Sequence, residues 1–121
     1  MKTTFDHEKL DVYQISIQFV AWVGELIDGP LAGCRLNVVK HLDKASTSTT
    51  LNIAEGNGKR SLKDRCRFFD ISNGSTLESS ACLDVLVARK ALDVQDTHQG
   101  KALLVRIVEM LAKLNAKLRS T

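Results

Sequence analysis

Aromatic residues and proline are scarce in this chain. Its 121 residues include one proline, four phenylalanines, one tyrosine and one tryptophan. With so few rings, the core must be built mainly from leucine, isoleucine, valine and alanine, a composition that suits helices. The single proline and the apolar content of 44% argue against disorder. A chain of this length forms one domain, which we place at residues 1–121.

The sequence also lacks paired cysteines and long apolar runs, and we expect no signal peptide. Cys34, Cys66 and Cys82 are odd in number and form no C-x-x-C pair, so we expect reduced, half-buried thiols in a cytoplasmic protein. A catalytic cysteine would need a matched base, and no motif marks one. Residues 1–8 are too polar for a signal peptide, and no run is long and apolar enough to cross a membrane.

Apolar residues recur with helical spacing in four segments of the chain. In the first segment, the stripe from Val12 to Leu26 is flanked by a second stripe that includes Ile17 and Ile27. Together the two stripes are about twice as wide as one bundle seam requires, so we expect a subunit interface on this helix. The predicted helices span residues 9–28, 31–55, 61–92 and, from 96 or 97, to 119.

Polar side chains interrupt the apolar pattern of the second and third segments. Residues 45–50 read Ala-Ser-Thr-Ser-Thr-Thr, a run that is poor in helix formers. We expect a helix there because small residues allow close helix approach and hydroxyls can bond back to the preceding turn; a strand is the alternative. In the third segment the seam is polar at Asn73, Thr76 and Ser80, which costs stability but can fix register.

Short connections join the four segments. They run over residues 28–31, 56–60 and 93–96. Short connections force sequential helices to be antiparallel neighbours. The predicted fold is therefore an all-α, up-down-up-down antiparallel four-helix bundle without internal repeats.

The middle connection has the strongest turn signal. Gly56 and Gly58 can adopt the positive φ that other residues avoid. Ser61 can then cap the next helix by accepting a hydrogen bond from the backbone N–H of Asp64.

This topology places the middle connection and both termini at one end of the bundle. The residues assigned to that end, 1–18, 48–74 and 108–121, include ten basic and seven acidic residues, which accounts for the whole net charge of +3. So mild a charge permits a nucleic-acid partner without requiring one. The end is either a phosphate-binding surface or a solvated helix end with arginines paired to nearby acids. The candidate phosphate contacts are Lys59, Arg60, Lys63, Arg65, Arg67, Lys113 and Lys117.

Glu55 and Glu78 are candidates for a paired metal site, but the topology argues against such a site. Glu55 lies at the turn and Glu78 far along the third helix, so they cannot share a metal within one subunit. We expect Glu55 to bond Tyr13 or the first turn of the third helix, and Glu78 to pair with Lys40 or Lys44. No nucleotide loop or Ser/His/Asp arrangement is identifiable, so we expect no catalytic site, metal or cofactor.

Three motifs between residues 10 and 92 are specific enough to be compared with known families. They are Leu10-x-Val12-Tyr13-Gln14, Asn52-Ile53-Ala54-Glu55-Gly56-x-Gly58-x-Arg60-Ser61 and Arg67-Phe68-x-x-Ile71-x-x-Gly74-Ser75-x-x-Glu78. Together they resemble the four-helix bundle family that is also called the 23S ribosomal RNA intervening-sequence proteins. The chain departs from the family at Asn57, where members usually have an aromatic residue. The resemblance implies that nine residues of these motifs have a structural role: Tyr13, Asn52, Glu55, Gly56, Gly58, Ser61, Gly74, Ser75 and Glu78.

The resemblance also implies what kind of protein this is. Members are small cytoplasmic bacterial proteins without known enzymatic activity, and those of known structure form ring-shaped homopentamers. A distant relative is a basic pentamer that binds nucleic acid and a reverse transcriptase. We therefore expect a non-enzymatic homo-oligomer that binds RNA or DNA through its basic end. The alternative is a protein-interaction scaffold with no nucleic-acid role, which the wide apolar surface of the first helix supports.

Overall fold

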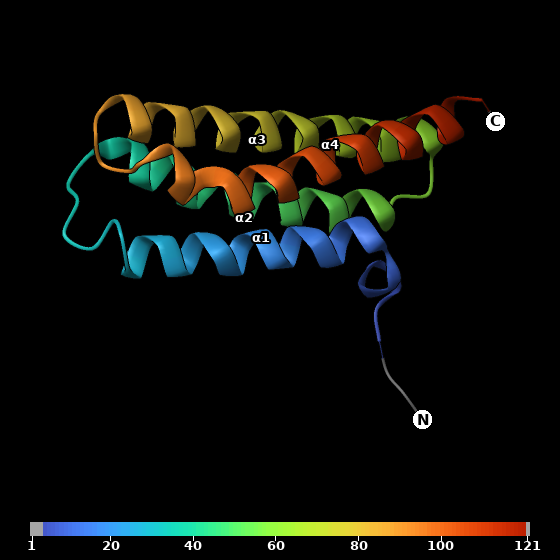
Figure 1. Ribbon diagram of the computed structural model, residues 1–121. Helices are drawn as coiled ribbons and strands as arrows, with labels where there is room; N and C mark the ends of the chain where they lie inside the picture. Colours follow the sequence, from blue (N-terminus) through green and yellow to red (C-terminus); the bar gives the residue numbers. More distant parts are fainter. Residues whose placement is uncertain (1–3, 121) are drawn as a thin grey trace.

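Four long helices run antiparallel in up-down-up-down order, as the sequence predicts (Figure 1). The computed structural model describes residues 4–120. The α2–α3 turn lies at the same end of the bundle as both termini, and we call this end the basic pole. The other end, with the α1–α2 and α3–α4 connections, is the far pole. The helices are η1 (Asp6–Lys9), α1 (Asp11–Asp28), α2 (Asn37–Asn57), α3 (Leu62–Ala88), η2 (Val94–Thr97) and α4 (His98–Arg119).

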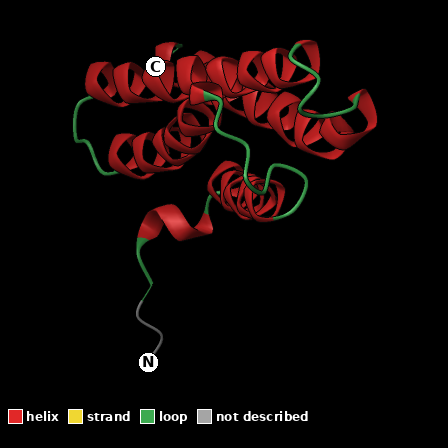
Figure 2. Ribbon diagram, turned by 90° about the vertical axis from the view of Figure 1, so that its left-hand side faces the viewer, coloured by secondary structure: helices red, strands yellow, loops and turns green. Residues whose placement is uncertain are grey.

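The second helix begins later than the sequence predicts. Residues 31–36, expected to be helical, form a loop, and α2 starts at Asn37. Gly33 has a φ of 78°, a left-handed conformation that no helix contains. Leu31 is only 3% exposed and contributes to the core from this loop, which explains why its apolar pattern resembled a helix. The connections at the far pole are visible end-on in Figure 2.

Hydroxyl groups fill the contact between α2 and α3. Residues 45–50 are helical, so the strand alternative is wrong. Thr49 is fully buried; its Oγ1 donates to the Ala45 carbonyl at 3.2 Å and lies 3.2 Å from Thr76 Oγ1. Ser72 Oγ donates to the Thr49 carbonyl across the interface at 2.8 Å. The predicted back-bonding is thereby confirmed, and the small side chains let the two helices approach closely.

The polar seam of α3 is confirmed at Thr76, but its other two positions lie one residue earlier than predicted. The side chains of Ser72, Thr76 and Ser79 are buried, whereas Asn73 and Ser80 are only half-buried. All three buried hydroxyls have hydrogen-bond partners, so the seam fixes register without leaving a hydroxyl unpaired.

Large apolar side chains fill the remaining interior. Phe19 of α1, Ile53 of α2, Phe69 and Leu83 of α3 and Ile107 of α4 are at most 1% exposed. Burial of such side chains stabilises a domain by about 1.5–3 kcal/mol each. Within residues 4–120, no helix is both long and apolar enough to span a bilayer.

Candidate nucleic-acid interface

The α2–α3 turn is formed by close packing rather than by unusual backbone angles. The predicted positive φ at Gly56 and Gly58 is wrong: Gly58 has a φ of −85°, and Gly56 lies within α2. Gly56 is required because a Cβ there would lie 2.9 Å from the Cβ of Phe68 and 3.0 Å from the ring of Phe69. The predicted cap at Ser61 is confirmed, since its Oγ accepts from the Asp64 N–H at 3.0 Å.

A chain of hydrogen bonds ties the N-terminal segment to this turn. Asn57 is 9% exposed; its Nδ2 donates to Asp6 Oδ2 at 2.9 Å, and its Oδ1 accepts from an Arg65 amino group at 3.1 Å. The other Arg65 amino group donates to the Lys59 carbonyl at 3.5 Å. Arg65 is half-buried and holds the turn together, so its guanidinium is less available to a ligand than those of its neighbours.

The remaining cations of the turn lie on the surface. Arg60 and Lys63 are exposed and have no ion pair within residues 4–120. Arg67 is also exposed: its Nε lies 3.8 Å from Asp64 Oδ1, and its guanidinium lies 4.5 Å from the centre of the Phe68 ring. Lys59 Nζ lies 4.9 Å from the same ring centre. An exposed ion pair at this distance contributes little, so Arg60, Lys63 and Arg67 are available to phosphates, whereas Lys59 is half-buried.

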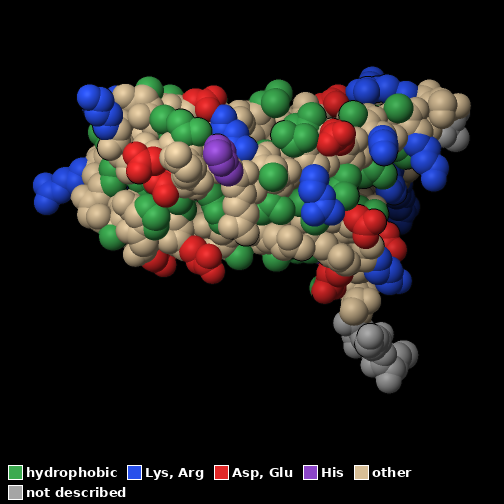
Figure 3. All heavy atoms as spheres, viewed as in Figure 1, with side chains coloured by type: hydrophobic (Ala, Val, Ile, Leu, Met, Phe, Trp, Pro, Cys, Tyr) green, Lys and Arg blue, Asp and Glu red, His purple; other side chains and the backbone are tan. Residues whose placement is uncertain are grey.

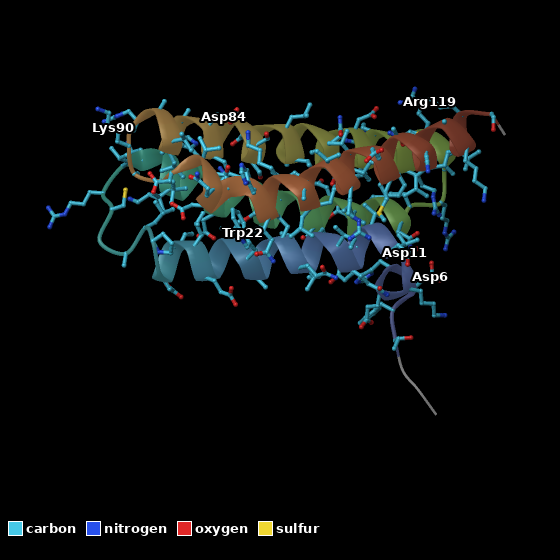
Figure 4. The ribbon with its side chains drawn as sticks, viewed as in Figure 1. Asp6, Asp11, Trp22, Asp84, Lys90 and Arg119 are labelled. Carbon is cyan, nitrogen blue, oxygen red and sulfur yellow. The ribbon has the colours of Figure 1, made fainter. Side chains whose placement is uncertain are left out.

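A groove between α3 and α4 extends the cationic surface. Its volume is about 700 Å³, with an apolar floor and a basic rim. Arg119, which was not among the predicted phosphate contacts, lies at this pole as well (Figure 4). Its amino group bonds Asp70 Oδ2 at 2.9 Å. The sequence signal was its place in the last turn of α4. The lining residues are Leu62, Lys63, Cys66, Arg67, Asp70, Ile71, Leu118 and Arg119.

The two predicted lysines of α4 lie on the neighbouring face. Lys113 and Lys117, together with Lys9, line a groove of about 410 Å³ between α1 and α4. Both α4 lysines are exposed. The structure therefore distributes the predicted cations around one pole rather than in one pocket. Lys and Arg side chains are visible at this pole on the right of Figure 3.

The carboxylates of the motifs do not make the predicted bonds. Glu55 is exposed, and no hydrogen bond joins it to Tyr13 or to the first turn of α3 within residues 4–120. Glu78 is exposed as well, and neither Lys40 nor Lys44 pairs with it. Both predictions are wrong: each glutamate is exposed on the surface of its helix and forms neither of the bonds expected of it.

The other motif residues have different surroundings. Ser75 Oγ lies 2.8 Å from Ser48 Oγ across the α2–α3 interface. Asn52 Nδ2 donates to the Ser48 carbonyl at 2.8 Å. Tyr13 is half-buried with its ring against His7, and Gly74 is exposed, with open space where a Cβ would stand. The hydroxyl groups of Ser48 and Ser75 thus link α2 to α3, whereas the amide of Asn52 bonds within α2.

The cysteines show no sign of an activated nucleophile. None of the three forms a disulfide, and Cys66 and Cys82 are buried. Burial raises the pKa of the Cys82 thiol, and the negative charge of Glu78 raises it further. A protonated, buried thiol is a poor nucleophile. Within residues 4–120 no three His, Cys, Asp or Glu side chains gather in a potential metal site.

Comparison with known proteins gives one family and one fold. The family model of the 23S rRNA-intervening sequence protein matches residues 8–113. No curated protein matches the chain. A crystal structure from Bacteroides thetaiotaomicron, of a protein with unknown function from the S23 ribosomal protein family, is similar with a TM-score of 0.76 and 17% identity. The match covers 86% of this chain and 97% of that one, and at this identity it shows the fold alone.

Proposed function

The chain belongs to the 23S rRNA-intervening sequence protein family, and from its basic pole we propose that it is a non-enzymatic, homo-oligomeric, cytoplasmic helical bundle that binds RNA. The observation that carries the proposal is the group of exposed cations around the α2–α3 turn. Arg60, Lys63 and Arg67 project from one short stretch of chain into solvent. Three guanidinium or ammonium groups at such spacing suit a phosphate backbone.

The contact set of this proposal differs from the sequence prediction in one residue. Arg65 is bonded to Asn57 and to the Lys59 carbonyl, so it holds the turn. Arg119 takes its place at the rim of the α3–α4 groove. Phosphate contacts of this kind carry no sequence information, and the binding is accordingly weakly sequence-specific and sensitive to salt.

Self-association is supported by apolar side chains left on the surface of one subunit. Ile17 of α1 is 44% exposed, which agrees with the wide apolar arc of that helix. Leu77 and Val105 are more exposed still, at 55% and 58%, and line a second, separate groove between α3 and α4. A second copy would remove these side chains from water. A ring, with five members as the proposed number, would multiply the contacts of each subunit with one RNA.

The second candidate function is a protein-interaction scaffold with no nucleic-acid role. The same exposed side chains, Leu77 and Val105, favour it, because an apolar groove also suits a helix of another protein. A pull-down that recovers one defined protein after nuclease treatment, from a chain that binds no RNA, would favour this function.

The experiment for RNA binding compares two variants of equal charge. The pole variant replaces Arg60, Lys63 and Arg67 by alanine, and the control replaces the exposed far-pole cations Arg35, Lys40 and Arg89. Binding of a labelled RNA at about 0.1 M salt should weaken on the order of 100-fold in the pole variant, because each lost phosphate contact forfeits its counterion release. The control should bind like the wild type. Equal binding by all three proteins, or binding by none, contradicts the proposal.

The oligomeric state is tested by mass measurement in solution. The chain alone should have a mass that is a multiple of the subunit mass, and addition of RNA should increase that mass without dissociating the ring. Replacement of Leu77 and Val105 by lysine should shift the mass toward one subunit, while circular dichroism shows that the helices are retained. A monomeric wild-type protein at micromolar concentration contradicts the oligomer.

A further inference from the structure

A small aromatic surface lies beside the basic pole. The ring of Phe5 stacks on the His7 imidazole with centroids 5.7 Å apart and planes 9° from parallel. The His7 ring in turn meets Tyr13 edge-on, with centroids 4.7 Å apart. Phe5 is 74% exposed, more than any other large apolar side chain within residues 4–120. One face of this phenyl ring is thus available to a ligand.

Burial does not explain the position of this ring. Three-quarters of Phe5 remains in contact with water, so its apolar surface contributes little to the core. The segment is nonetheless held in place: the Phe5 N–H donates to Glu8 Oε2 at 2.6 Å, and Asp6 accepts from the buried Asn57 at 2.9 Å. The second bond spans 51 positions of the sequence and fixes η1 against the turn.

The segment that carries the aromatic pair has acids of its own, Asp6 and Glu8, and adjoins two cationic parts of the basic pole. On one side, Asn57 connects Asp6 to the turn that carries Lys59 and Arg60. On the other side, Lys9 is the last residue of η1 and lines the α1–α4 groove with Lys113. Proteins that bind single-stranded nucleic acid combine exposed aromatic rings with a positively charged surface, because every base has a π-face and every nucleotide a phosphate.

We infer that Phe5, stacked on His7, is a base-stacking site, and that the basic pole takes single-stranded RNA in preference to duplex RNA. The inference rests on the proposed function, since the phosphates must first be held by the cations of the pole. One unpaired base stacks on the exposed face of Phe5 while the flanking phosphates meet Lys59, Arg60 and Lys9. Asp6 is the positioning residue, because its bond to Asn57 sets the pair beside the turn.

The test measures binding of a single-stranded RNA of about 12 nucleotides, a length within the usual site sizes, and of a duplex of the same length. Phe5→Ala and Phe5→Leu should each weaken single-strand binding by about 5- to 10-fold, the lower part of the range for loss of one stacked base, and leave duplex binding unchanged. Phe5→Trp should retain single-strand binding. Val94→Ala at the far pole, where the side chain is 54% exposed, is the matched control and should have no effect.

The positioning role of Asp6 has its own pair of variants. Asp6→Ala removes the acceptor for Asn57 and should lower the preference for single strands, whereas Asp6→Asn keeps an acceptor oxygen and should restore it. Because Phe5 and Asp6 are exposed, circular dichroism should show intact helices in every variant.

The outcomes separate this inference from the function on which it rests. If the wild type binds both RNAs and Phe5→Leu binds single strands as tightly as the wild type, the stacking site is refuted while RNA binding at the pole stands. If the wild type binds neither RNA, the proposed function fails and the stacking site fails with it. Selective loss of single-strand binding in Phe5→Leu, with retention in Phe5→Trp, establishes the site.

Discussion

The two poles of the bundle are built differently. At the basic pole only residues 58–61 separate α2 from α3, and Gly56 lets the helices touch. At the far pole the connections are longer, and they contain both residues with positive φ within residues 4–120, Gly33 and Lys90. Acids and bases at the far pole are balanced, and Lys101 pairs with Asp84. Figure 4 shows Asp84 in the far-pole half of α3.

The difference indicates where the chain needs a fixed geometry. At the basic pole a tight turn, a serine cap and the Asp6–Asn57–Arg65 bonds hold the backbone that carries the cations. The far pole closes the bundle through loops whose main contribution is apolar, such as Leu31 and Leu92 in the core. Positively charged side chains that must meet a ligand are most effective on a rigid support.

The largest expected effect on stability comes from Gly56→Ala. The new Cβ would meet the Cβ of Phe68 at 2.9 Å, and that atom cannot move without the backbone of α3. We expect the free energy of unfolding to fall by about 2–3 kcal/mol, the upper range for overpacking, as measured by urea denaturation.

Two other glycines sharpen this prediction. At Gly100, in the far-pole half, a Cβ would overlap the far end of the half-buried Trp22 side chain rather than a Cβ of another helix, so Gly100→Ala should cost less than Gly56→Ala. Gly74 has open space around it, and Gly74→Ala should stabilise by about 0.5–1 kcal/mol through helix propensity. Equal destabilisation at Gly56 and Gly74 would refute the close approach of the two helices.

Alanine substitutions of Arg65 and Arg60 should distinguish a cation that stabilises the fold from one that only lies on the surface. Arg65→Ala leaves the buried Oδ1 of Asn57 without its donor and should destabilise the fold by about 1–2 kcal/mol. Arg60→Ala removes an exposed side chain and should change stability by at most about 0.5 kcal/mol. Urea denaturation of both variants checks this, and a stability loss in Arg60→Ala as large as that in Arg65→Ala would contradict the assignment.

The smallest expected effect concerns Cys82 and alkaline pH. Because burial and Glu78 raise the thiol pKa of the folded chain above its ordinary value of 9.0, the unfolded chain releases this proton first. The stability that the neutral thiol provides is therefore complete below about pH 9 and is lost as the pH rises through the folded-state value. Between about pH 8 and about pH 10, the free energy of unfolding measured by urea denaturation should fall less in Cys82→Ala than in the wild type.

The helices were largely predictable because their apolar residues repeat at helical spacing. Residues 11–28, 62–88 and 98–119 all lie within the predicted segments. The loop at residues 31–36 was not predictable, because its apolar residues have spacings that a helix would also show. The positive φ of Gly33, which excludes a helix there, is visible only in the structure. The one-position shift in the α3 seam has the same origin, since serine occurs on both faces there.

The candidate site was predictable only in outline. Topology gathers the cations at one pole, and the sequence therefore predicts Lys63 and Arg67 as surface charges. The bond between Asp6 and Asn57 joins residues far apart in sequence and leaves no periodic trace. Neither the structural role of Arg65 nor the stacking of Phe5 on His7 could be predicted without coordinates.

The most direct test of the basic pole is the salt dependence of RNA binding. The logarithm of the association constant, plotted against the logarithm of the salt concentration, gives a slope set by the number of phosphates neutralised. Loss of Arg60, Lys63 and Arg67 together should make the slope shallower by about 2–3, while loss of Arg35, Lys40 and Arg89 should leave it unchanged. Identical slopes for the wild type and both triple variants would contradict a phosphate-binding basic pole.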